Sequence, residues 1–213
     1  MTEYHLSTPL SNEDISQLRA GDTIYLSGTV FTARDEAHME LIEHKGIPGF
    51  DMTGLGLYHC GPVMKQEDPE VPEAGGLPSD AGHDNWCVVS AGPTTSFRME
   101  TLEPPFLDLF GVKVIIGKGG MGPLTLEALR KHTVVYVSFT GGAGALAAKG
   151  LGRVKDVHYL EELGMPEAVW VFEAKEFGPL VVSMDSHGHS LYSDVNAGTM
   201  KNLTRILTEK GLD

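Results

Sequence analysis

Cysteine is scarce in this chain of 213 residues. Its two cysteines, Cys60 and Cys87, are far apart and form no C-x-x-C pair. Two cysteines cannot build a disulfide framework, so the sequence favours a reducing compartment. It also lacks the run of roughly 18 apolar residues that a membrane helix needs, and it lacks the basic and then apolar start of a signal peptide. We therefore expect a soluble, cytoplasmic protein with no membrane partner.

Basic residues are also few. The chain has 16 Lys and Arg against 29 Asp and Glu, which gives a formal net charge of −13. Nucleic-acid binding needs clustered Lys and Arg, because these side chains release counterions from the phosphates. The composition thus argues against a nucleic-acid partner. A small anion can still bind where Arg, Lys and backbone N–H groups gather locally.

The length and the pattern of apolar residues favour one compact domain over residues 1–213. Short apolar runs followed by glycines and then by amphipathic segments predict an α/β domain with a buried sheet. We expect helices over 11–21, 34–45, from about 94, over 124–131 and over 194–212. We expect strands over 22–26, 29–32, 55–60, 86–90, 112–116, 134–139, 154–160, 168–173, 180–184 and 190–192.

Residues 65–84 interrupt this pattern. The segment is acidic, rich in Pro and Gly, and without apolar periodicity. Loops longer than about 15 residues are uncommon in compact domains, and they often serve as lids, interface segments or disordered links. We predict a long loop there.

The segment Ser90-Ala-Gly-Pro-Thr-Thr-Ser-Phe-Arg-Met99 has the composition of an anion site. A strand is expected to turn at the Gly-Pro pair and enter a helix, whose first N–H groups would attract a carboxylate. Thr94 and Thr95 offer hydroxyl groups, and Arg98 lies one helical turn after Thr94. The alternative is an ordinary helix cap with a surface arginine.

Two more segments could contribute to the same kind of site. In Ile115-Ile-Gly-Lys-Gly-Gly-Met-Gly122, Lys118 and Gly119 follow a strand, and the glycines allow a ligand close to the backbone. The alternative there is a tight turn. At the start of the helix over 34–45, Arg34, Asp35 and His38 can face one cleft, or they can form a solvated helix start.

Three other patterns are weaker. Gly142-Ala-Gly-Ala-Leu-Ala147 matches a dinucleotide fingerprint, but at most about two helical turns follow before the next strand. His59, Cys60, His83 and Cys87 could form a zinc site, although adjacent residues of a strand point to opposite faces. The segment 187–189 (HGH) is more simply a hairpin turn than a metal site.

Read in order, TARDEAH, YHCGP, GPTTSFRM and IIGKGG resemble the β subunit of the class I iron–sulfur fumarate hydratase and L(+)-tartrate dehydratase family. In single-chain members this region is the C-terminal domain. The resemblance covers nearly the whole chain. It implies a swivelling β/β/α layered domain with a mixed sheet, and a hydro-lyase that acts on a small dicarboxylate.

The resemblance also implies roles for individual residues. Thr94 would be the catalytic base, and Arg98, Lys118 and Arg34 would bind the carboxylates and hydroxyl of the substrate. Further substrate-binding candidates beside them are Thr95, Asp35, His38 and Gly119.

The resemblance places the [4Fe-4S] cluster on another chain. Three cysteines of a partner α subunit would hold it, with the fourth iron free to bind substrate, in a hetero-oligomer of the (αβ)2 type. The composition agrees with this division, because two cysteines outside any cluster motif cannot ligate such a cluster. We therefore expect no metal ligands in this chain, and no activity without the α subunit.

The chain departs from the family pattern at Phe97, where many members have a small residue, at Glu100 and at Gly120. Phe97 can reshape the pocket, so fumarate, tartrate and mesaconate all stay open as substrates. The rival interpretation is a non-catalytic anion-binding or interaction module of the same fold.

Overall fold

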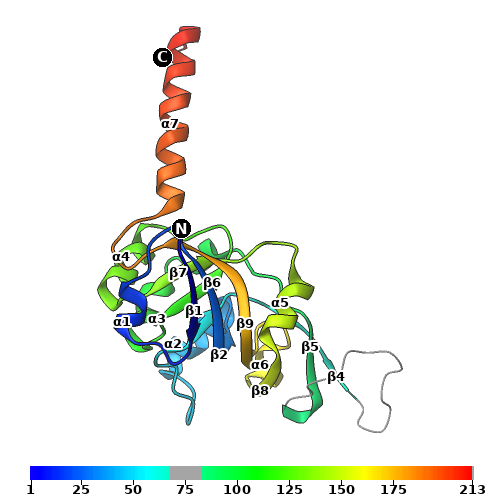
Figure 1. The fold of residues 1–213 in the computed structure, drawn as a ribbon. Coiled ribbons are helices and arrows are strands. Elements are labelled where there is room, and N and C mark those ends of the chain that lie inside the picture. Colours follow the sequence, from blue (N-terminus) through cyan, green and yellow to red (C-terminus); the bar gives the residue numbers. More distant parts are fainter. Residues whose placement is uncertain (68–82, 213) are drawn as a thin grey trace.

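The computed structural model describes residues 1–67 and 83–212 (Figure 1). Seven of the strands form one mixed sheet in the order β1-β2-β3-β6-β7-β9-β8. Their bounds are β1 Glu3–Ser7, β2 Thr23–Thr32, β3 Gly56–Tyr58, β6 Val114–Gly117, β7 Val135–Ser138, β8 Arg153–His158 and β9 Val169–Met184. The mixed α/β class expected from the sequence is confirmed.

The long strand β9 closes part of this sheet into a ring. β2, β3, β6 and β7 are successive parallel neighbours, and β7 pairs with β9 in the antiparallel sense. β9 then pairs with β2, also antiparallel, so the ladder returns to the strand where it began. Each ring strand therefore has one inner and one outer row of side chains.

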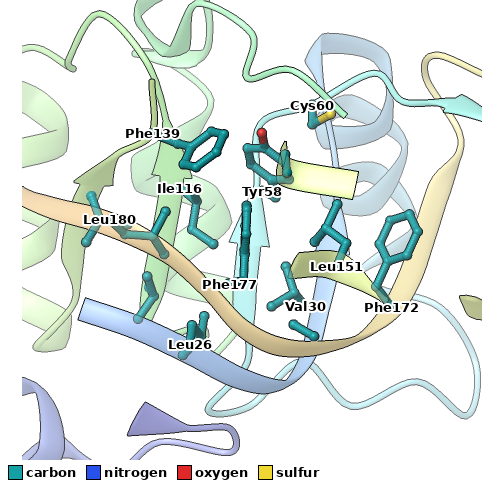
Figure 2. Packing of buried hydrophobic residues seen from close by; sticks show 14 of the residues in the cluster. Leu26, Val30, Tyr58, Cys60, Ile116, Phe139, Leu151, Phe172, Phe177 and Leu180 are labelled. Atoms are coloured by element: carbon teal, nitrogen blue, oxygen red, sulfur yellow. The ribbon is translucent and has the colours of Figure 1, made fainter. Parts of the chain in front are cut away.

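The two rows build two apolar cores. Leu26 and Val30 of β2 belong to one core, together with Tyr58 of β3 and Phe172 of β9; Figure 2 shows these side chains close together. The neighbouring residue Phe31 belongs to the other core. This second core lies under the helices α2, α3 and α4, which cover the outer face of the parallel strands.

The helices of the described residues are α1 Asn12–Ser16, α2 Asp35–His44, α3 Glu103–Leu109, α4 Pro123–His132, α5 Gly144–Leu151, α6 Leu160–Leu163 and α7 Leu191–Lys210. α7 extends away from the body, and none of its residues is buried (Figure 1). No helix in the described part of the chain combines the length and the apolar character that crossing a bilayer requires.

Several expected elements are confirmed. Ser11 caps α1 in a capping box with Asp14, and Arg34 precedes α2, which ends at Lys45 in the left-handed conformation. α4 also matches its expected range closely.

Other expectations are wrong. The strands expected over 22–26 and 29–32 are one strand, β2, and those over 168–173 and 180–184 are one strand, β9. Residues 190–192 are not a strand, because Ser190 caps α7. The expected loop over 65–84 begins later than predicted, since Lys65 and Gln66 belong to β4 (Val63–Gln66), which pairs with β5 (Trp86–Ser90). Most of that loop lies outside the described residues.

Candidate active site

Three segments meet at the carboxyl ends of the parallel strands β2, β3 and β6. Arg34 follows β2, and Lys118 follows β6. Thr94 reaches the same edge because its backbone N–H donates to the carbonyl of His59, just after β3, at 2.7 Å. Ligands of α/β sheets commonly bind at this edge, where loops from neighbouring strands converge.

The threonine and lysine segments are joined through their backbones. Thr95 and Lys118 form a parallel β-bridge, and the N–H of Ser96 donates to the carbonyl of Lys118 at 3.0 Å. Gly117 makes this contact possible, because a Cβ there would overlap the Ser96 hydroxyl. The sequence predicted that these segments serve one site, and the structure places them side by side.

An ion pair joins the segment of Arg34 to the segment of Thr94. Nη2 of Arg98 lies 2.7 Å from Oδ2 of Asp35, the first residue of α2. Arg98 is half exposed (53%), so this pair adds little stability but restrains the guanidinium. Asp35, expected among the substrate-binding residues, is thus engaged with Arg98.

Arg34 is held by a residue that the sequence interpretation missed. Its Nε lies 3.2 Å from Oε1 of Glu167, and a Cβ at Gly61 would lie 2.5 Å from Nη1. Burial raises the pKa of Glu167, and the nearby Arg34 offsets this only in part. The glutamate follows Gly164-Met-Pro, in the stretch that resembles the family, so its position there could have drawn attention to it.

Three polar groups of this site have no partner in the part of the chain that the structure describes. Among the described residues, the hydroxyls of Thr94 and Thr95 and the ammonium of Lys118 make no hydrogen bond or ion pair. Thr94 and Lys118 are partly exposed and Thr95 is exposed, as is Gly119 beside Lys118. These groups are therefore available to a ligand.

The helix expected from Thr94 is not there. Ser96–Met99 forms a short 3-10 helix, and Pro93 before it makes a β-bridge with Cys60. The N–H groups of Thr94 and Ser96 are already used by carbonyl groups, so the expected capture of a carboxylate by a helix N-terminus is wrong here. An anion at this site has to be bound mainly by side chains.

The N-terminus of α4 is also occupied. The carboxylate of Glu100 accepts hydrogen bonds from the backbone N–H groups of Gly122, Leu124 and Thr125, at 2.6, 2.9 and 3.3 Å. It also accepts one from the Thr125 hydroxyl at 2.7 Å. An internal carboxylate thus fills the anion site of this helix.

His38 does not face the cleft as expected. Its side chain is fully buried, and its Nδ1 lies 2.7 Å from the carbonyl oxygen of Arg34. Its Nε2 faces the buried carboxylate of Glu103 instead. The helical spacing correctly placed His38 beside Arg34, but it did not show that the imidazole turns inward.

A groove of about 650 Å³ lies beside the glycine loop. Phe97 and Gly119 line one part of it, and Tyr192 and Val195 of α7 line another. Phe97 is 59% exposed, so the residue that departs from the family pattern lies on a free wall next to the site.

The chain's own donors do not suit an iron–sulfur cluster. Burial raises the pKa of the Cys60 thiol to about 12 and that of Cys87 to about 11, which disfavours the thiolate form that metals bind. His59 and Cys60 point into different cores, so the zinc site considered from the sequence does not form through them. α5, which begins within the glycine pattern at 142–147, has eight residues, as the short spacing predicted.

Comparison with known proteins agrees with these observations. The model of the Fumarase C-terminus family matches residues 1–195. This chain belongs to that family. The L(+)-tartrate dehydratase subunit beta of Escherichia coli K12 is 43% identical over 189 residues, which covers 89% of this chain and 86% of that protein.

Two further relatives widen the comparison. A Methanocaldococcus jannaschii protein provisionally named L(+)-tartrate dehydratase subunit beta is 42% identical over 202 residues, covering 93% of this chain and 95% of that protein. A Geobacillus stearothermophilus protein provisionally named fumarate hydratase class I is 38% identical over 201 residues, covering 94% of this chain. The chain described here matches only 36% of that longer protein.

Proposed function

We propose that this chain is the β subunit of a hydro-lyase that adds water to, or removes it from, a small dicarboxylate. Fumarate to malate and tartrate to oxaloacetate are the leading reactions. Relatives named as tartrate dehydratase β subunits and as fumarate hydratase support the reaction class. We also assign the fold to the swivelling β/β/α type with a mixed sheet, which the mixed seven-stranded sheet covered by α2, α3 and α4 supports.

One observation carries this proposal: three segments distant in sequence bring cations and a free hydroxyl to one sheet edge. The Arg98–Asp35 pair joins the first two, and the bridge between Thr95 and Lys118 joins the last two. A dianionic substrate needs such a cluster, because its two carboxylates must be held against the acidic field of a chain with net charge −13.

The side chains divide the chemistry between them. Removing a proton next to a carboxylate places a second negative charge on it, so the transition state requires cations aimed at that group. Arg98, Arg34 and Lys118 supply them. Thr94, whose hydroxyl has no partner among the described residues, acts as the base in its alkoxide form and becomes the neutral hydroxyl when it takes the substrate proton; the neighbouring cations lower the cost of forming that alkoxide.

The [4Fe-4S] cluster belongs to a partner α subunit in this proposal. Two protonated, separated thiols cannot hold it here. Lys118 and Thr94 have no partner among residues 1–67 and 83–212, which supports an opening of the site towards a second chain. When present, the cluster would supply a Lewis acid for the substrate hydroxyl. We expect an (αβ)2 assembly in the cytoplasm, where free cysteines such as Cys60 and Cys87 persist.

The decisive experiment is anaerobic co-expression with an α subunit of the family, followed by turnover assays with fumarate, tartrate and mesaconate. Thr94→Ala should abolish turnover while dianion binding persists. The matched control is Thr101→Ala, which removes an exposed hydroxyl outside the site and should keep full activity.

The results separate the two interpretations of this fold. Turnover that survives Thr94→Ala rejects the base assignment. A complex that binds the dianion but turns over none of the substrates would instead identify an anion-binding module. Native mass measurement of the complex checks the (αβ)2 stoichiometry.

A further inference from the structure

A fully buried carboxylate lies directly behind the candidate site. Glu103, at the start of α3, has no exposed surface, and neither do His38 of α2 and His59 after β3. Nε2 of His59 lies 3.2 Å from Oε2 of Glu103, and Nε2 of His38 lies 3.5 Å from the same oxygen. The sequence interpretation missed this cluster because its members come from three separate segments.

Each imidazole contacts a segment of the site through its other nitrogen. Nδ1 of His38 lies 2.7 Å from the carbonyl oxygen of Arg34. Nδ1 of His59 lies 2.9 Å from the hydroxyl of Ser96, which also accepts a hydrogen bond from the Tyr136 hydroxyl at 3.0 Å. One side of the cluster thus touches the arginine segment, and the other touches the threonine segment.

The backbone extends these contacts to the remaining site residues. The His59 carbonyl accepts from the N–H of Thr94, and the N–H of Ser96 donates to the carbonyl of Lys118. A path of direct contacts therefore runs from Arg34 through His38, Glu103 and His59 to Thr94 and, through Ser96, to Lys118.

The protons in this path can be counted. The Arg34 carbonyl can only accept, so Nδ1 of His38 donates, and a favourable contact with Glu103 needs a second proton on Nε2. For His59, the Ser96 hydroxyl can donate to Nδ1 while Nε2–H points to Glu103. One imidazolium, one neutral imidazole and one carboxylate thus give each group a partner of opposite character.

The ionisation tendencies agree with this count. Burial lowers the pKa of His59, which favours its neutral form. Burial alone would raise the pKa of Glu103, but the two imidazoles bring it down to about 2, so the carboxylate is ionised. Fold stability does not account for such a cluster, because well-packed apolar residues usually serve a core as well or better.

We propose that Glu103, with His38 and His59, is a positioning unit that sets the relative places of Arg34, Thr94 and Lys118. The inference rests on the proposed function for its catalytic meaning, since those three residues are the substrate-facing groups. None of the three buried side chains touches the substrate. His38 and His59 act through their contacts with Arg34 and Ser96, and the His59 backbone accepts from the N–H of Thr94.

The first test needs no substrate. In backbone NMR spectra of the full chain, Glu103→Ala should shift the amide signals of Arg34, Thr94 and Lys118 together. Ile15→Ala is the control, because Ile15 is equally buried but belongs to α1, which precedes the amino end of β2. If the three signals stay in place in Glu103→Ala, or move equally in both variants, the proposal is overturned.

The second test uses the αβ complex. Displacement of a catalytic group by about 1 Å can cost roughly 100-fold in rate. Glu103→Ala should therefore lower kcat/KM by about 10- to 100-fold, through both a lower kcat and a higher KM. Glu103→Gln should recover part of this loss, because its amide oxygen can still accept from Nε2 of His59. An equal loss of kcat/KM in Ile15→Ala would overturn the proposal.

Two outcomes keep the inference separate from the proposed function. If the complex turns over no dicarboxylate, the proposed function fails while the amide shifts still decide the positioning role. Metal analysis of the purified chain provides the other check, because two imidazoles and a carboxylate can also bind zinc. If the native chain holds stoichiometric metal and Glu103→Gln holds none, an ion joins these side chains. That result would overturn the proposal that Glu103, His38 and His59 are joined through protons.

Discussion

Glu100 and Glu103 are three residues apart and almost equally shielded from water, at 8% and 0% exposure, yet their surroundings differ completely. Glu100 accepts four hydrogen bonds from the first turn of α4. Neither oxygen of Glu103 has a hydrogen bond of good geometry to a described residue, and two imidazoles face one of them. The first carboxylate completes one helix, whereas the second lies where three distant segments meet.

The difference shows two ways to compensate a buried charge. A helix N-terminus presents preformed N–H groups, so Glu100 is satisfied by its own neighbourhood. Glu103 depends on side chains from α2 and from the end of β3, and its environment exists only when those segments are in place. A locally satisfied carboxylate stabilises, while one satisfied from a distance also constrains the geometry of the groups around it.

The largest expected effect is on stability in Glu103→Ala. Removing one partner of a buried charged cluster typically costs about 3–5 kcal/mol. Urea unfolding at pH 7 should show this loss, and most of it should remain in Glu103→Gln, which keeps the volume of the side chain but not its charge. A much smaller loss in Glu103→Gln would mean that the volume of the side chain matters here, and its charge does not.

The second-largest effect is the loss of stability at low pH that comes from Glu103. The folded-state pKa of Glu103 is about 2, below its ordinary value of 4.5, so its contribution to stability is complete above pH 4.5 and is lost as the pH falls towards 2. This contribution is on the order of 3 kcal/mol. The difference in unfolding free energy between the native chain and Glu103→Gln should therefore be smaller at pH 3 than at pH 5. An equal difference at the two pH values would contradict the low pKa of Glu103.

A smaller loss is expected for Glu100→Ala. Removing a helix cap costs about 0.5–2 kcal/mol, and the four hydrogen bonds of Glu100 place this variant near the upper end. Thermal unfolding measures the loss, and hydrogen exchange should show faster opening at Gly122, Leu124 and Thr125. If exchange at these three amides is unchanged, Glu100 does not cap α4 in solution.

The smallest effect is expected at the exposed edge of the site. Asp35→Asn removes the partner of the half-exposed Arg98, and such pairs contribute about 0–1 kcal/mol. Its unfolding free energy should therefore stay close to that of the native chain. The KM should still change, because the guanidinium loses its restraint. A stability loss as large as that of Glu103→Ala would contradict this order.

Much of the fold was predictable from local patterns, and the errors have a common cause. The sequence predicted separate strands on either side of Gly28, and separate strands over 168–173 and 180–184, but β2 and β9 are continuous. At Gly28 the backbone bulges and the Thr8 hydroxyl would lie 2.5 Å from an added Cβ, so the glycine serves a close approach within a strand. Closure of the ring depends on pairing between β2 and β9, which no local pattern reveals.

The solvent-facing residues of the candidate site could be selected from the sequence, because cations and hydroxyls in short glycine-containing motifs indicate anion binding. Arg34, Arg98, Lys118 and Thr94 lie in short motifs with cations, hydroxyls and glycines. Glu103 was not recognised, because a glutamate before Pro104 resembles an ordinary acidic helix start. Its partners His38 and His59 are more than 40 residues away, and only the folded chain shows them together.

Gly117 has a consequence for how this site can vary. A single methyl group there would meet the Ser96 hydroxyl and separate the strand before Lys118 from the loop that carries Thr94. The distance between the Lys118 ammonium and the Thr94 hydroxyl therefore depends on the absence of a Cβ at position 117. Redesign of the substrate range can alter Phe97 on the open wall, but any side chain introduced at position 117 should widen the site before it changes its selectivity.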